Sequence, residues 1–281
     1  MIKRIQVCTD GSQNSHAACE YGISLAQKLK AKLTGIHVLD SRMLEGPLMA
    51  DISGWIGAQP YGSQLQQFRD VLEQKGNTIV DAFDERCQAA GINGEGIIRM
   101  GHPSRVLLEE ETHAELIILG QRGIHADLIG NALGSTAERV VRQSIKPCMV
   151  VPTQFKPISK LLAAYDGSNY SSKALHQAIE LAKALEVELI ILAVAEGKEA
   201  AQAEEASREA MDLAEAHECQ AISLVSEDDH AAESIITNAE EQGADLIVMG
   251  AYGHGRIRQW VLGSTTTYVL THTDIPAMMV H

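Results

Sequence analysis

The sequence predicts an α/β protein with two tandem domains, each a doubly wound sheet of five parallel strands. Short apolar runs alternate with amphipathic helical patterns along the chain, which is typical of α/β domains. The runs are continuously aliphatic, as expected for strands that are buried on both faces of a parallel sheet. The whole plan then occurs a second time, and this duplication indicates two domains of one type.

The composition supports a well-packed, acidic protein. Of the 281 residues, 45% are hydrophobic and only 4% aromatic, so we expect an aliphatic core. The formal net charge of −14 disfavours non-specific binding to nucleic acids and anionic membranes, because both need Lys and Arg contacts to phosphates. We therefore expect no nucleic-acid partner and no membrane partner. An anion site built from backbone N–H groups remains compatible with this charge.

The first residues and the cysteines predict a cytoplasmic location. The stretch MIKRIQVCTDGS reaches a polar turn by residue 10 and lacks the apolar core of a signal peptide. The apolar stretches are all shorter than the roughly 18 residues that a membrane-spanning helix needs. The five cysteines show no CxxC spacing, and Cys8 and Cys148 lie inside apolar runs. We interpret the cysteines as reduced, mostly buried thiols.

The two copies begin with similar segments, RIQVCTDGSQNSHAACEYGISLAQKL at residue 4 and KLLAAYDGSNYSSKALHQAIELAKAL at residue 160. Asp166 follows Asp10 by 156 positions, whereas Ser264 follows Ser135 by 129, so the first copy is longer by the difference of 27. Most of this excess is residues 43–68, which are expected to form a lid, a partner surface or a disordered loop. We predict domains at 1–152 and 160–281.

The elements of the second copy follow in strict alternation. Strands are predicted at 161–165, 189–194, 221–225, 246–249 and 277–280, and helices at 171–186, 200–217, 231–242 and 264–272. The acidic run at 196–218 is interpreted as a solvated helix face. Crossovers in such a sheet are right-handed, and ligands bind outside the carboxyl ends of the strands.

Small and acidic residues stand at these predicted carboxyl ends. Asp166 opens an Asp-Gly-Ser turn after the first strand, and Gly250 and Gly253 follow the fourth. The turn alone also fits an ordinary helix cap. Gly263-Ser264 then opens the last helix, whose free N–H groups form a ready anion site. We expect Ser264 to cap this helix and to donate to a phosphate oxygen.

The spacing Gly-x2-Gly-x9-Gly-Ser resembles the nucleotide-binding signature of the universal stress protein family. With Asp166, a last strand IPAMMV and the duplication, the resemblance covers both copies apart from residues 43–68. It implies a Rossmann-like, adenine nucleotide alpha hydrolase-like fold. It also implies binding of ATP, with or without Mg²⁺, although some members bind AMP-like nucleotides or none.

The resemblance also implies which residues bind the nucleotide. In the second copy Asp166 and Val194 would contact adenine or ribose, and the phosphates would lie against Gly250, Gly253, Gly263, Ser264 and Thr265. The matching positions of the first copy are Asp10, Val38, Gly120, Gly123, Gly134, Ser135 and Thr136. The first copy has ten residues between its second and third glycines rather than nine, and is the less regular site.

These observations favour a cytoplasmic stress-response protein that binds an adenine nucleotide and acts as a regulator. One alternative is a nucleotide-free scaffold. Another is a slow ATPase, although the chain lacks the GxxxxGK[ST] pattern and no catalytic or metal-binding residue is predicted. The resemblance further implies that the two halves pair through their last strands, CMVV and AMMV, with a homodimer as a further option. His102, His230 and His272 are interpreted as ordinary surface histidines.

Overall fold

The computed structural model describes residues 2–45, 61–124, 132–195, 200–252 and 262–281. The first half contains, in chain order, β1 (Arg4–Cys8), α1 (Gln13–Leu29), β2 (Lys32–Asp40), α2 (Arg42–Glu45), α4 (Tyr61–Ala89), β3 (Gly94–Gly101), α5 (Pro103–Glu110), the 3-10 helix η1 (Glu111–His113), β4 (Leu116–Gly120), α7 (Ser135–Gln143) and β5 (Cys148–Val151). Among the described residues no helix is both long and apolar enough to cross a lipid bilayer.

The second half repeats this order, with β6 (Lys160–Ala164), α8 (Asn169–Leu185), β7 (Glu188–Ala195), α9 (Ala200–Ala216), β8 (Ala221–Glu227), α10 (Ala231–Glu241), β9 (Leu246–Gly250), α11 (Ser264–His272) and β10 (Ala277–Val280). The predicted strands and helices of this half are all present, and their ends lie within about two residues of the expected positions. The predicted α/β class is confirmed.

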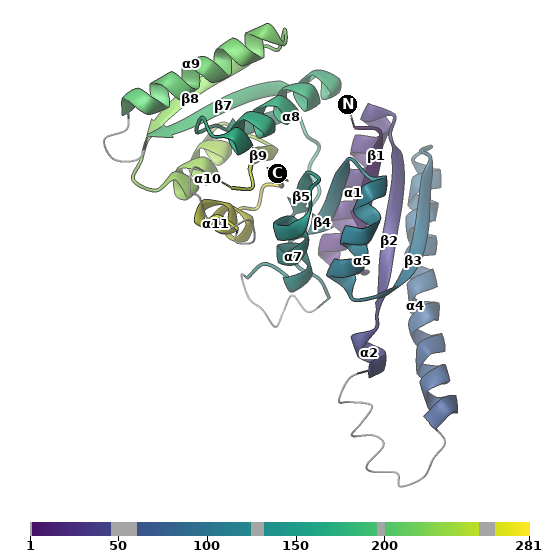
Figure 1. Ribbon diagram of the computed structural model, residues 1–281. Coiled ribbons are helices and arrows are strands. Elements are labelled where there is room, and N and C mark those ends of the chain that lie inside the picture. Colours follow the sequence, from purple (N-terminus) through teal and green to yellow (C-terminus); the bar gives the residue numbers. More distant parts are fainter. Residues whose placement is uncertain (1, 46–60, 125–131, 196–199, 253–261) are drawn as a thin grey trace.

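The strands form one sheet in the order β3-β2-β1-β4-β5-β10-β9-β6-β7-β8 (Figure 1). Neighbouring strands are parallel within each half, whereas β5 and β10 are antiparallel, with Met149 opposite Met278. The strands of the two halves therefore run in opposite directions. As a result, the carboxyl ends of the first half lie at one edge of the sheet and those of the second half at the other.

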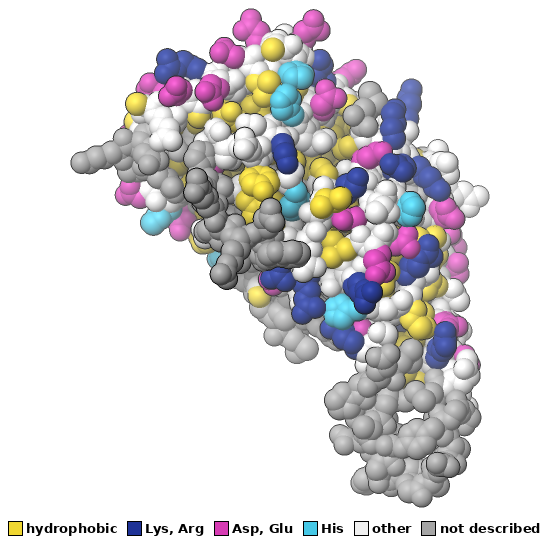
Figure 2. All heavy atoms as spheres, in the orientation of Figure 1, with side chains coloured by type: hydrophobic (Ala, Val, Ile, Leu, Met, Phe, Trp, Pro, Cys, Tyr) yellow, Lys and Arg dark blue, Asp and Glu magenta, His cyan; other side chains and the backbone are white. Residues whose placement is uncertain are grey.

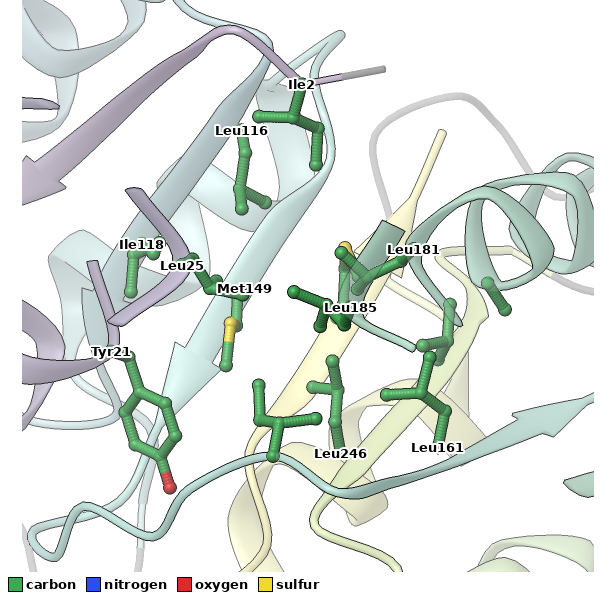
Figure 3. Packing of buried hydrophobic residues seen from close by; sticks show 14 of the residues in the cluster. Ile2, Tyr21, Leu25, Leu116, Ile118, Met149, Leu161, Leu181, Leu185 and Leu246 are labelled. Atoms are coloured by element: carbon green, nitrogen blue, oxygen red, sulfur yellow. The ribbon is translucent and has the colours of Figure 1, made fainter. Parts of the chain in front are cut away.

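Helices cover both faces of the sheet. One face packs against α1, α4, α8 and α9, and the other against α5, α7, α10 and α11. Each of the two large apolar clusters contains residues from both halves. In Figure 3, Met149 of β5 and Leu185 of α8 face the same space between the halves. The core is thus continuous across the β5–β10 seam.

The first helix of each half begins in the same way. Ser12 and Ser168 are the N-caps of α1 and α8, and each hydroxyl accepts the backbone N–H of the residue three positions later. An Asp two residues earlier accepts the N–H of each cap at 2.9 Å. The Asp-Gly-Ser turns therefore stabilise helix starts in both halves.

The long first-half excess is described only in part. Figure 1 shows α4 extending beyond the sheet towards the short α2. Residues 46–60, which include most of the 43–68 segment, lie outside the described residues. The expectation of a lid, a partner surface or a loop is therefore untested.

Candidate functional site

A cavity of about 480 Å³ lies at the carboxyl edge of the second-half strands. Six of the predicted residues line it: Asp166, Val194, Gly250, Gly263, Ser264 and Thr265. They come from the ends of β6, β7 and β9 and from the start of α11. Gly253, the remaining predicted residue of this half, lies outside the described residues, as do His254 and Arg256. The topology thus brings together positions that are almost 100 residues apart in the chain.

Two glycines of this cavity have different structural requirements. A Cβ at Gly250 would lie 2.9 Å from both the carbonyl carbon and the Cβ of Tyr170, so the start of α8 needs a glycine there. Among the described residues, a Cβ at Gly263 would meet nothing closer than Thr266 Oγ1 at 3.6 Å, which is ordinary contact. Packing within the protein therefore accounts for Gly250, whereas it leaves the glycine at 263 without a steric reason.

The start of α11 differs from the expectation in one respect. The N-cap is Gly263 rather than Ser264, and no side chain caps this helix. The prediction that Ser264 caps α11 is therefore wrong, because Ser264 is already the first helical residue. The Thr266 hydroxyl instead donates to the Ala251 carbonyl at 3.1 Å and fixes the loop to the helix. The first N–H groups of α11 consequently face the cavity edge without a side-chain acceptor.

The corresponding loop of the first half is held by backbone hydrogen bonds. Gly134 N–H donates to the Gln121 carbonyl at 2.8 Å, and Ile124 N–H donates to Asp10 Oδ2 at 3.1 Å. A Cβ at Gly123 would lie only 2.6 Å from that same Asp10 oxygen. Both oxygens of Asp10 thus accept backbone N–H groups, since Oδ1 binds Ser12 N–H. The predicted site residues Val38, Gly120, Ser135 and Thr136 occupy the equivalent strand ends and helix start.

A cavity of about 360 Å³ adjoins Asp10 in the first half. It lies between α1 and α4 and is lined by His16, Lys75, Ile79 and Arg86, among others. Of the first-half residues predicted to bind nucleotide, Asp10 is the only one that lines this cavity. Its surroundings therefore differ from those of Asp166.

One equivalent position, on α4 of the first half and on α9 of the second, explains part of the difference between the two cavities. In the first half, Val80 of α4 packs over Gly96 in β3. In the second half, the hydroxyl of Ser207 in α9 forms a hydrogen bond with that of Ser223 in β8. Gly96 and Ser223 occupy matching positions in the strands of the two halves. Ile79 of α4 and Ala206 of α9 are therefore equivalent. The Ile79 side chain reaches to 3.2 Å from where a Cβ of Gly11 would be, whereas Ala206 leaves room for the cavity.

The α9 residues of the second-half cavity were not among the predicted site residues. Gln202, Ala203 and Ala206 all line it, although the segment was interpreted as a solvated helix face. The acidic side of α9 is indeed exposed, whereas Ala203, Ala206, Ala210 and Ala214 on its other side are buried. Their spacing of three and four residues is the signal that could have identified this side.

Each glycine loop also contacts the other half. The Tyr252 hydroxyl donates to the carbonyl of Arg142 in α7 at 2.9 Å, and its ring lies edge-on to those of Tyr170 and His281. Burial raises the pKa of Tyr252, so the phenol stays protonated as a donor. In return, Gln121 Nε2 donates to the Thr273 carbonyl at the end of α11 at 2.9 Å. The two loops are thus anchored on the last helices of opposite halves.

The family model of the universal stress protein family matches this chain twice, over residues 1–152 and 157–281. The chain belongs to the universal stress protein family. The predicted resemblance is confirmed, including the tandem arrangement. The universal stress protein Slr1230 of Synechocystis sp. is 33% identical over 290 aligned residues, which cover 99% of both chains.

A solved universal stress protein shares the fold. This protein, from Archaeoglobus fulgidus, superimposes with a TM-score of 0.75 at 22% identity and covers 99% of this chain and 97% of its own. Another, solved in complex with cAMP, is 26% identical, covers 45% of this chain and 98% of its own, and has a TM-score of 0.40. The cAMP is the ligand of that protein.

Proposed function

We propose that this universal stress protein binds ATP or a related adenine nucleotide in the second-half cavity. The observation that carries the proposal is that six residues predicted from the motif line one cavity of about 480 Å³. This volume lies within the range of roughly 300–1,000 Å³ that is usual for small-ligand sites. Gly253 remains part of the proposed site on the motif alone.

The parts of the cavity fit the parts of a nucleotide. The uncapped start of α11 offers backbone N–H groups at Gly263, Ser264 and Thr265, which suit phosphate oxygens. Asp166 and Val194 at the ends of the neighbouring strands would contact ribose and adenine. Mg²⁺ would arrive with ATP and be held mainly by phosphates and water, since among the described residues no three His, Cys, Asp or Glu side chains form a metal site.

The first half is the weaker candidate for the same ligand. Its site would comprise Asp10, Val38, Gly120, Gly123, Gly134, Ser135 and Thr136. Its second and third glycines are separated by ten residues rather than nine, and of its predicted residues only Asp10 lines the cavity between α1 and α4. We therefore propose that the second half binds first and more tightly.

The proposed role is regulatory and cytoplasmic. Nucleotide binding would set the arrangement of the second-half loop, and partner proteins would read that arrangement during stress. We also propose that domains 1–152 and 160–281 pair with each other within one chain, which the antiparallel β5–β10 contact supports. A homodimer would then need a surface other than these two strands.

The deciding experiment combines mass spectrometry of nucleotides released from the purified chain with calorimetric titration of ATP. Gly263→Val should abolish ATP binding and keep the fold, because the protein itself leaves space at that Cβ. The matched first-half variant Gly134→Val should retain it. Absence of both co-purified nucleotide and binding at millimolar ATP would favour the nucleotide-free scaffold. Release of labelled phosphate that depends on Asp166 would instead favour a slow ATPase.

A further inference from the structure

A second, chemically different groove lies between α5 and α7 of the first half. Its volume is about 530 Å³, and its lining includes His102, Ser104, Arg105, Arg139 and Arg142. In Figure 2, dark-blue Lys and Arg side chains gather around a histidine over the region of these two helices. The chain as a whole has a net charge of −14, so a groove lined by three arginines differs in charge from the protein as a whole. We infer that this groove binds a small, multiply charged phosphate compound.

The arginine at its centre contacts a histidine and not a carboxylate. Arg139 Nη1 lies 3.4 Å from His102 Nε2, and His102 Nδ1 lies 3.2 Å from the hydroxyl of the buried Ser104. A guanidinium can only donate, so in this contact Arg139 is the donor. Among the described residues no ion pair therefore neutralises the charge of Arg139.

The other two arginines have partners that an anion can displace. Arg105 pairs with Glu109 at 2.9 Å and Arg142 with Glu138 at 3.4 Å, both across one helical turn. Exposed pairs of this kind are weak, because water and side-chain entropy offset most of the attraction. A phosphate, by contrast, accepts paired N–H donors from the planar guanidinium fork of each arginine.

The equivalent groove of the second half lacks these features. The N-cap histidine is kept, since His230 begins α10 as His102 begins α5. The position of Arg139, however, holds Tyr268, whose hydroxyl donates to Glu233 at 3.2 Å. The second half thus has a tyrosine bonded to a glutamate at this place, where the first half has arginines. This contrast makes the second half a built-in control.

The groove is separate from the nucleotide cavity. It lies on the first half and shares no lining residue with the second-half cavity. The backbone carbonyl of Arg142, which receives the Tyr252 hydroxyl, is a direct connection between the two. The inference nevertheless stands on the arginines and does not depend on the proposed nucleotide site.

The test is calorimetric titration of the full chain with inorganic pyrophosphate at constant ionic strength. We expect saturable binding to the wild type. Arg139→Gln and Arg142→Gln should each weaken it about tenfold, the usual effect of losing one charge-assisted hydrogen bond. Tyr268→Phe, the matched change in the second half, should leave it unchanged. Arg139 is exposed, so its replacement should not affect the melting temperature.

Three results would overturn the inference. The first is an absence of saturable binding to the wild type. The second is an affinity that does not change in the double variant Arg139→Gln/Arg142→Gln. The third is loss of pyrophosphate binding in Gly263→Val, which would assign the ligand to the nucleotide cavity. Retention of pyrophosphate binding in a Gly263→Val protein that no longer binds ATP would support both sites independently.

Discussion

At the scale of single residues, the glycines of the motif divide into two kinds. Gly250 is required by the backbone of α8, since a Cβ would lie 3.0 Å from Ser171 N, whereas a Cβ at Gly263 would make only ordinary contacts with the described residues. Packing therefore explains one glycine of the motif and leaves the other to the proposed ligand. These separate reasons could not be predicted from the sequence, because they depend on neighbours that only the folded chain brings close.

Gly250→Ala should therefore destabilise the protein, whereas Gly263→Ala should not. We expect a loss of about 1–3 kcal/mol in the free energy of unfolding for Gly250→Ala, because the start of α8 has to move. Gly263→Ala should change the free energy of unfolding by no more than about 0.5 kcal/mol. Urea denaturation of both variants without ligand measures the difference. Equal stabilities would contradict this division.

The cysteines give a second prediction at this scale. Burial raises the pKa of Cys148 to about 12 and those of Cys19 and Cys87 to about 11, and it also raises the pKa of Cys8. Since the thiolate is the reactive form, these thiols should resist alkylation in the folded protein at pH 8. The half-buried Cys219 should react first. Peptide mass spectrometry after iodoacetamide treatment, with and without urea, tests this order.

At the scale of elements, the strands and helices of the second half could be predicted almost to the residue. Continuous aliphatic runs and Asp-Gly-Ser turns are local signals, and they are strong here. On the inner side of α9, the spacing of the alanines indicates a buried face but does not show what that face covers. Whether Ala206 lies over a cavity depends on its distance from the ends of β6 and β7, which no local pattern contains.

The difference between Ile79 and Ala206 predicts a change that closes the site. Ala206→Ile should fill the second-half cavity and weaken ATP binding at least about tenfold, as expected when a bulky side chain occupies a ligand's volume. Ile79→Ala in α4 is the matched variant and should leave the second-half affinity unchanged. Calorimetric titration measures both. Full affinity in Ala206→Ile would place the ligand elsewhere.

The contact between His281 and α7 predicts a pH effect. The imidazole nitrogens lie 2.6 Å from the Val141 carbonyl and 3.2 Å from that of Lys146, and burial lowers the pKa of His281, with Lys173 contributing. Its contribution to stability is thus present above the unfolded pKa of about 6.5 and is lost as the pH falls through the lower folded value. Between pH 7.5 and 5.5 the wild type should lose more thermal stability than His281→Gln. Equal losses would exclude a role for this ring.

At the scale of the whole molecule, one sheet and two shared apolar clusters join the halves. Two domains of the same fold could be predicted from the sequence, because the same pattern of strands, helices and turns occurs twice. The family resemblance also implied that the halves pair through their last strands. The loop contacts made by Tyr252 and Gln121 were not predicted, because they arise between the halves and no single copy of the repeat contains them.

This continuity predicts a single unfolding transition. Met149 and Met278 are fully buried and face each other across the seam. Met149→Asp should cost about 3 kcal/mol or more, because it buries an unpaired charge between the halves. Met100→Asp on the exposed edge strand β3 is the control and should have little effect. Differential scanning calorimetry should give one peak for the wild type; two separate peaks would show that the halves unfold independently.

The linker at residues 152–159, between β5 and β6, keeps the two halves of one chain close to each other. A short tether holds two binding surfaces at an effective concentration in the millimolar range, so each half always has the same neighbour. The pair therefore behaves as a heterodimer that cannot exchange subunits. A mutation in one half therefore always acts beside the same second half. Each half could diverge in sequence, one towards an open cavity and the other towards an arginine groove, while it stays paired with its neighbour.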